Sequence, residues 1–157
     1  MRITHTIAIM FIASFIIQYF IMSAVMVDKM GNITNSISKV YMATLMALFM
    51  VVIEVGMHDH QYSVFSLNTY LIIAALIGGT IYLYRKQMGI NDKQYLAGMI
   101  EHHSMALLTS EEIVNKTDDY NVAKFAKNII QTQTDEIREM RELLNKKRSE
   151  EHTSELQ

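Results

Sequence analysis

The chain has 157 residues, of which 50% are hydrophobic, and its formal net charge is -2 at pH 7. It contains no cysteine, which excludes disulfides, thiolate metal sites and cysteine catalysis, and its slight negative charge argues against a nucleic-acid partner. Apolar residues are concentrated in the first 84 positions, so an apolar N-terminal part is followed by a charged C-terminal part.

Three apolar runs in the N-terminal part are long enough to cross a membrane as helices. Residues 7–27 are an uncharged run of 21 residues, which as a helix would measure about 31 Å against about 30 Å for a hydrocarbon core. A signal peptide is the alternative, but its apolar region is shorter. Residues 40–57 form the second run, and residues 67–84 the third, with tyrosines suited to the membrane interface. We therefore expect a membrane domain over residues 1–86.

One acidic residue, Glu54, lies near the end of the second run. An ionisable residue within a span is a functional candidate by default. The alternative is a side chain that reaches the membrane interface close to His58, Asp59 and His60.

The chain is rich in methionine, with 13 in all. Two sets are spaced by four residues: Met22, Met26 and Met30 in the first run, and Met42, Met46 and Met50 in the second. This spacing predicts that each set lies along one helix face. Thioethers are soft ligands that suit Cu(I). The alternative is that methionine serves as a flexible apolar filler between helices.

The charged part, residues 87–147, predicts an antiparallel helical hairpin. Asn91 or Asp92 can cap a first helix that ends near residue 115, and Asp118 or Asp119 can cap a second helix that ends near residue 147. The second helix carries an apolar stripe made of Val122, Phe125, Ala126, Ile129, Ile130, Ile137, Met140 and Leu144, interrupted by Gln133. A lone hairpin buries little surface, so we expect a second copy to complete a four-helix bundle, or the membrane helices to cover the hairpin. The expected fold class is all-α.

The first hairpin helix contains two adjacent histidines, His102 and His103, between Met99 and Met105. His102 is three residues from each methionine, and His103 is four residues after Met99, so one side of this helix can present imidazoles and thioethers together. The alternative follows from helix geometry, because adjacent residues point about 100° apart. One histidine would then face solvent while the other is a half-buried, hydrogen-bonded residue.

The second hairpin helix offers Glu136 and Met140, again at helical spacing. Nitrogen and thioether donors without thiolate fit copper better than calcium or magnesium. Zinc is the alternative ion, and it would need a carboxylate such as Glu101, Glu111 or Glu136 beside the histidines.

Two segments of the hairpin, MIEHHSMALLTSEE and AKNIIQTQTDEIREMRELL, resemble the domain of unknown function 305 family, a small helical His/Met domain also found in CopM-type copper-binding proteins. The resemblance covers about residues 91–144. The N-terminal part is more loosely similar to the membrane portion of family members with three spans, chiefly through YMATLMALFM.

The resemblance implies a ferritin-like helical bundle and a role in metal tolerance, often at the cell envelope. It implies copper or other metal binding through these ligands: His102, His103 and Met105, with Met99 and Met140 as supporting sulfurs. The chain departs from the family pattern where Glu101 replaces a common proline and where Leu108 and Thr109 replace a common methionine. These departures favour Cu(II) or zinc over tight Cu(I) binding.

The expected function is that of a membrane-anchored metal-binding protein that buffers or delivers copper in a bacterial cell membrane. An enzyme is not expected, because no nucleophile–base pair, phosphate-binding loop or paired carboxylates stand out. The expected partners are the lipid bilayer, a second copy of the chain and copper-handling proteins. Two alternatives are a copper conduit that uses the methionine sets and a structural dimerisation module without metal. The distribution of basic residues favours a cytoplasmic hairpin, whereas the resemblance favours the envelope side.

The last ten residues, 148–157 (RSEEHTSELQ), resemble the translation of a common sequencing adapter. We interpret them as an artefact that follows the hairpin, and a genuine charged helix end is the alternative.

Overall fold

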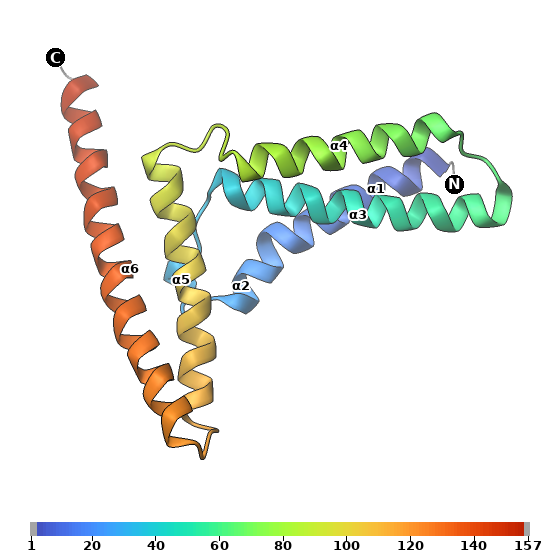
Figure 1. Ribbon diagram of the computed structural model, residues 1–157. Coiled ribbons are helices and arrows are strands. Elements are labelled where there is room, and N and C mark those ends of the chain that lie inside the picture. The colour runs from blue at the N-terminus through green and yellow to red at the C-terminus, as the bar shows by residue number, and fades with distance from the viewer. Residues whose placement is uncertain (1–2, 156–157) are drawn as a thin grey trace. The chain divides into compact units, whose positions relative to one another are not determined.

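The computed structural model describes residues 3–155, with side chains up to residue 150, and this part of the chain is all-helical (Figure 1). The expected all-α class is therefore confirmed, whereas the four-helix bundle and the dimer stay predictions. Contacts divide the chain into two compact units. The first contains residues up to 22 together with residues 37–89, and the second contains residues 23–36 together with the chain from residue 90 onward.

The first unit is built around one central helix, α3 (Ile37–Tyr62). It packs on α1 (Ile3–Ile16) on one side and on α4 (Leu67–Arg85) on the other, and consecutive helices run in opposite directions (Figure 1). A π-helical turn, η1 (Ile17–Met22), follows α1. Val51, Val55 and Ile73 form the buried core of this unit, at the contact of α3 with its neighbours.

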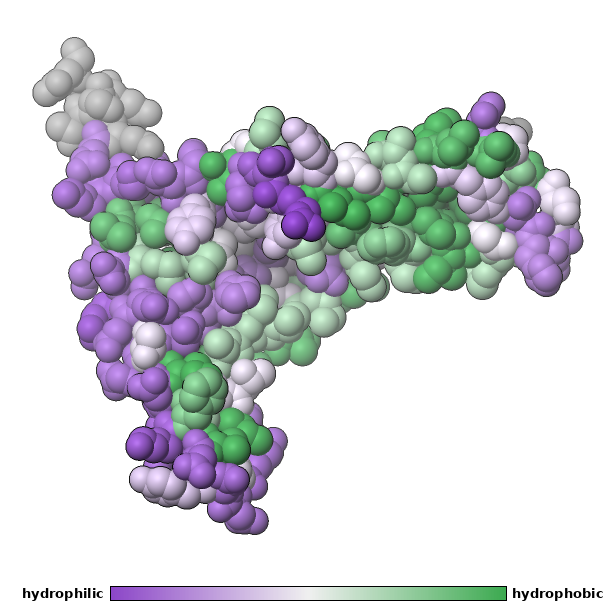
Figure 2. All heavy atoms as spheres, in the orientation of Figure 1, coloured by the Kyte–Doolittle hydropathy of each residue, from purple (hydrophilic) through white to green (hydrophobic). Residues whose placement is uncertain are grey.

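Three helical stretches are long and apolar enough to cross a membrane: Ile3–Met26, Ile37–Tyr62 and Leu67–Arg85. They correspond to the three predicted runs, and the second helix extends beyond the prediction at both ends. Figure 2 shows that hydrophobic residues cover most of the visible surface of the first unit. The exposed hydrophobic residues of this unit include Ile53 and Ile72, at 53% and 61% exposed.

Of the two methionine sets, only the second lies along one helix face, as its spacing predicts. In the first set, Met26 is the last residue of α2 (Ser23–Met26), and Met30 begins a separate 3₁₀ turn, η2 (Met30–Asn32). The chain bends between them, so Met22, Met26 and Met30 share no helix face. The second set lies within the unbroken helix α3, where Met42 and Met46 share an exposed face and the small residues Ala43 and Ala47 take the packed side.

A short turn after α4 ends the first unit. Gly89 adopts a φ of +71°, a left-handed conformation that glycine accepts without a side-chain clash. The Tyr41 hydroxyl donates a hydrogen bond of 2.8 Å to the carbonyl of Met88, which ties this turn to the start of α3.

The second unit contains the predicted hairpin, formed by α5 (Asp92–Val114) and α6 (Tyr120–Glu155). Asn91 caps α5 by accepting a hydrogen bond of 3.0 Å from the Gln94 amide. Asp119 caps α6 by accepting bonds of 2.7 and 3.2 Å from the amides of Asn121 and Val122. Both caps are among the predicted candidates. Helix α6 continues through residue 155, so part of the suspected tail is helical, and residues 156 and 157 lie outside the described residues.

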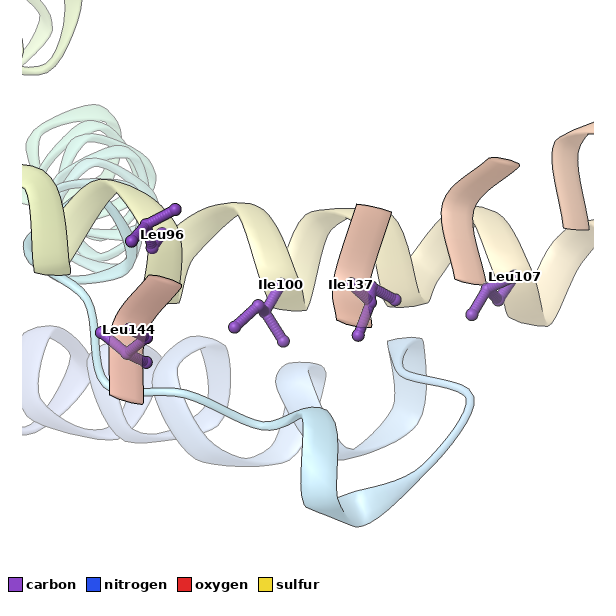
Figure 3. Packing of buried hydrophobic residues seen from close by; sticks show 5 residues of the cluster. All are labelled: Leu96, Ile100, Leu107, Ile137 and Leu144. Atoms are coloured by element: carbon purple, nitrogen blue, oxygen red, sulfur yellow. The ribbon is translucent and has the colours of Figure 1, made fainter. Parts of the chain in front are cut away.

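The hairpin core is a row of five buried side chains along the α5–α6 contact: Leu96, Ile100, Leu107, Ile137 and Leu144 (Figure 3). Ile130 and Met140 pack against this row. The predicted stripe of α6 is therefore buried only in part, because Val122 and Phe125 near the α5–α6 turn are 42% and 67% exposed.

Candidate metal centre

One histidine of the pair, His103, faces the other helix of the hairpin. Its Nδ1 atom lies 3.0 Å from Oε2 of Glu136 on α6, and its side chain is 14% exposed. The contact is at ion-pair distance, but it does not have the geometry of a hydrogen bond to the buried Nδ1 atom. Burial lowers the pKa of His103, the Glu136 carboxylate opposes that effect, and His102 adds to it, with a net pKa below the ordinary value. His103 is therefore held as the neutral imidazole, the form that binds metal ions.

The other histidine, His102, is exposed. Its ring centre lies 6.1 Å from that of His103, with the ring planes inclined by 62°. The arrangement matches the alternative derived from helix geometry, in which one histidine faces solvent and the other is half-buried. The structure therefore brings His103 and Glu136 together and leaves His102 beside them on the outer side.

The three candidate sulfurs are half-buried residues of the hairpin. Met99 precedes His103 by four residues on α5, and Met140 follows Glu136 by four residues on α6. Because the two helices are antiparallel, both steps lead in the same direction, about 6 Å along the hairpin from the His103–Glu136 contact. Met99 and Met140 therefore lie at one level of the hairpin, where Met140 packs against the core. Met105 lies on the other side of His103 along α5.

A carboxylate considered for zinc, Glu101, has a different role in the structure. It is 6% exposed. Its Oε1 accepts a hydrogen bond of 2.5 Å from the Ser23 hydroxyl, and its Oε2 accepts bonds of 2.9 and 3.3 Å from the amide and hydroxyl of Thr34. The prediction of Glu101 as a ligand beside the histidines is therefore corrected, because both of its oxygens bind the segment that joins the first two spans.

A second contact with the same segment involves Ser104, which is completely buried. The Asp28 amide donates a hydrogen bond of 3.0 Å to the Ser104 hydroxyl, which in turn donates to the Asp28 carboxylate. Burial opposes ionisation of Asp28, but the bonds from Ser104, Asn32 and the Lys29 backbone outweigh it and hold the pKa of Asp28 below its ordinary value. Nothing in the sequence predicted this contact, because Ser104 is an ordinary helix position between the candidate ligands His103 and Met105.

The polar residues at the end of α3 form a separate cluster in the first unit. Glu54 is 7% exposed, and its Oε1 lies 3.1 Å from Nε2 of His58. Asp59 accepts hydrogen bonds from the Phe65 amide and the Tyr70 hydroxyl, at 3.0 and 2.9 Å, and so holds the α3–α4 turn. Glu54 thus pairs with His58 of its own helix, one of the residues near which the alternative placed it.

The donor set can be compared with what metal ions require. Among the side chains described, those of residues 3–150, no group of three or more His, Cys, Asp and Glu is arranged to hold an ion. His103 and Glu136 supply one nitrogen and one carboxylate, so the thioethers would have to complete the coordination. Imidazole with thioether suits copper, and the available carboxylate also admits Cu(II) or zinc.

Comparison with known proteins identifies a family match and one similar protein. Residues 86–155 match the family described as domain of unknown function (DUF305). The chain is 38% identical over 144 residues to "Uncharacterized protein L153" of Acanthamoeba polyphaga mimivirus, an alignment that covers 90% of this chain and 93% of the relative. This relative is viral, so a bacterial source stays a prediction. No solved structure matches the chain. The chain therefore belongs to the family of the mimivirus protein L153, and its residues 86–155 form a DUF305 domain.

Proposed function

We propose that the chain is a membrane-anchored metal-binding protein that holds a copper ion between α5 and α6 and serves in metal buffering, delivery or tolerance. The observation that carries the proposal is the buried, unbonded Nδ1 of His103 beside Glu136. A buried polar atom without a partner is costly, and one facing a carboxylate from another helix is suited to share an ion with it. Delivery implies a copper-handling partner protein.

The ligands in this proposal are the six candidates from the sequence, in three groups. His103 and Glu136 form the centre, Met99 and Met140 supply sulfur one turn away, and the outer donors are His102 and Met105. Sulfur donors favour Cu(I), whereas Glu136 favours Cu(II) or zinc. A bound ion would supply a positive charge that joins the two helices, and the chain's own residues would orient it and limit its contact with water.

The anchor in this proposal is the first unit. Its three long apolar helices leave large hydrophobic side chains exposed, including Ile12, Phe20 and Leu71 at 57%, 60% and 58%. An apolar surface of this extent is unfavourable in water, and the length of the helices matches the thickness of a lipid bilayer. The side of the membrane that holds the hairpin stays a prediction.

The test is a titration of the full chain in detergent micelles with Cu(I) under reducing conditions, with a competing chelator and a parallel series with zinc. We expect His103→Ala to lose binding by at least about tenfold, since it removes the central donor. His60→Ala, which removes an exposed histidine of the first unit, is the matched control and should bind as the wild type does. Equal binding by the His103→Ala variant and the wild type would refute the proposed centre.

A second candidate function, self-association, is favoured by a specific surface. Near the α5–α6 turn, Ile113, Tyr120, Val122 and Phe125 are 41%, 75%, 42% and 67% exposed, and hydrophobic residues are visible there in Figure 2. Exposed apolar residues close together mark contact sites, and a second copy would complete the expected four-helix bundle. The copper conduit stays a prediction, to be tested by replacing Met42, Met46 and Met50 together and measuring copper uptake.

A further inference from the structure

The segment that joins the first two spans, residues 23–36, is clamped by both helices of the hairpin. On α5, Glu101 accepts hydrogen bonds from Ser23 and Thr34, and the carbonyl of Ala97 accepts a bond of 2.6 Å from the Thr34 hydroxyl. On α6, Arg141 donates from Nη2 to the Gly31 carbonyl at 2.9 Å. In Figure 3 the segment, drawn in pale blue, passes the hairpin core near Ile100. We call this set of contacts the clamp.

The clamp lies within the second unit and is made of polar groups that are largely buried and bonded to one another. Two of the polar residues on the segment that bond to the hairpin, Ser23 and Asn32, are 4% and 5% exposed. Asn32 accepts a bond of 2.5 Å from Arg141 and donates one of 2.6 Å to Asp28. Buried polar groups that are bonded to one another fix a single arrangement, because any displacement leaves several of them without partners.

The clamp and the proposed metal centre use neighbouring residues of the same two helices. On α5, Glu101 and Ser104 turn toward the segment, whereas His103 between them turns toward α6. On α6, Arg141 directly follows Met140 and lies five residues after Glu136. An ion held by His103 and Glu136 would fix the distance and the register between α5 and α6. The clamp needs the same distance and register, since it binds both helices at once.

We infer that metal binding at the hairpin and docking of residues 23–36 are coupled, so that each strengthens the other. The inference rests on the proposed function. Reciprocity is required by thermodynamics, because an ion that favours the docked arrangement must bind more tightly when the segment is docked. The segment continues at residue 22 into the first span and at residue 37 into the second, so the coupling connects metal occupancy to the ends of two membrane helices. This gives the hairpin a regulatory role in addition to storage.

The coupling is tested in the full chain in detergent micelles by Cu(I) titration of clamp variants. Glu101→Gln keeps the shape of the side chain but replaces an acceptor oxygen with an amide group. Arg141→Gln removes an exposed side chain from α6, so it weakens the clamp with little risk to the hairpin core. The matched controls are Glu112→Gln and Arg138→Gln, exposed residues of the same helices whose ion pairs, with Lys116 in the α5–α6 turn and with Asp135 on α6, do not involve residues 23–36. Helical circular dichroism verifies that every variant is folded.

We expect both clamp variants to bind copper about five- to tenfold more weakly, within the range of typical coupling between sites. The controls should stay within about twofold of the wild type. In the wild type, copper should also slow hydrogen exchange of the Asp28 and Thr34 amides, which bond to Ser104 and Glu101. Wild-type copper affinity in both clamp variants, or exchange unchanged by copper, would overturn the coupling alone. Failure of the wild type to bind copper would instead overturn the proposed function, and the coupling with it.

Discussion

Replacement of Ser104 by alanine removes one contact between α5 and residues 23–36, the pair of hydrogen bonds between Ser104 and Asp28. The Ser104 hydroxyl is fully buried and both accepts from and donates to Asp28, whose side chain is 2% exposed. A hydrogen bond to a charged group contributes about 1.5–3 kcal/mol, and a buried N–H group left without a partner costs about 1–3 kcal/mol. Alanine has a better helix propensity than serine, which offsets about 0.5 kcal/mol of this loss. Asn32 still donates a hydrogen bond to the Asp28 carboxylate. We expect the docked segment to lose about 2 kcal/mol, or about 30-fold in its docking equilibrium.

Hydrogen exchange measured by mass spectrometry on peptides that cover residues 27–36 reports this loss directly, because docking protects the Asp28 and Thr34 amides. Exchange in this region should accelerate about 30-fold in the variant, while peptides from α4 remain unchanged. Thr109→Ala is the control, since its exposed hydroxyl bonds only to carbonyls of its own helix. Exchange within about twofold of the wild type in the Ser104→Ala variant would refute the docking argument.

Three further predictions concern stability and assembly. Ile137→Ala should destabilise the hairpin by about 3 kcal/mol, because the side chain is buried in the α5–α6 core, and a lower unfolding temperature by circular dichroism is the measurement. The pKa of Asp28 is lowered from 3.8 in the folded chain, so its contribution to stability is present above pH 3.8 and is lost as the pH falls through the folded value. Asp28→Asn should therefore flatten the acid side of the stability curve, and an unchanged curve would contradict the assignment. Phe125→Ser should weaken self-association measured by sedimentation without lowering helix content, whereas Lys124→Ser, an exposed neighbour, should not.

The fold was predictable wherever one local pattern dominated. Apolar runs located the three helices that are long enough to cross a membrane, and the capping residues Asn91 and Asp119 located the starts of both hairpin helices. The first methionine set shows the limit of such patterns. Its spacing of four is helical, but the α-helix ends at Met26, and spacing alone does not show where a helix stops.

The candidate site was predictable in its composition but not in its orientation. The spacing of His102 and His103 left open which one faces the partner helix, because that depends on the rotation of α5 about its axis. Glu101 and Ser104 help to fix this rotation through bonds to residues 76 to 78 positions earlier in the chain. Contacts at that separation leave no periodic signal in a single sequence, so Glu101 read as a surface carboxylate or a ligand.

The clamp also orders the assembly of the protein during synthesis. Residues 23–36 leave the ribosome before the second span, yet their partners on α5 and α6 follow the third span, and Arg141 lies 110 positions after Gly31. The segment can therefore bond to the hairpin only after all three spans and most of the hairpin have been made. Until then, the groups that bond to α5 and α6 lack those partners. Closing so long a loop costs little more free energy than closing a shorter one, but it delays the step. A chain that ends before α6 would lack the bonds from Arg141 to Gly31 and Asn32, so residues 23–36 would be held by α5 alone.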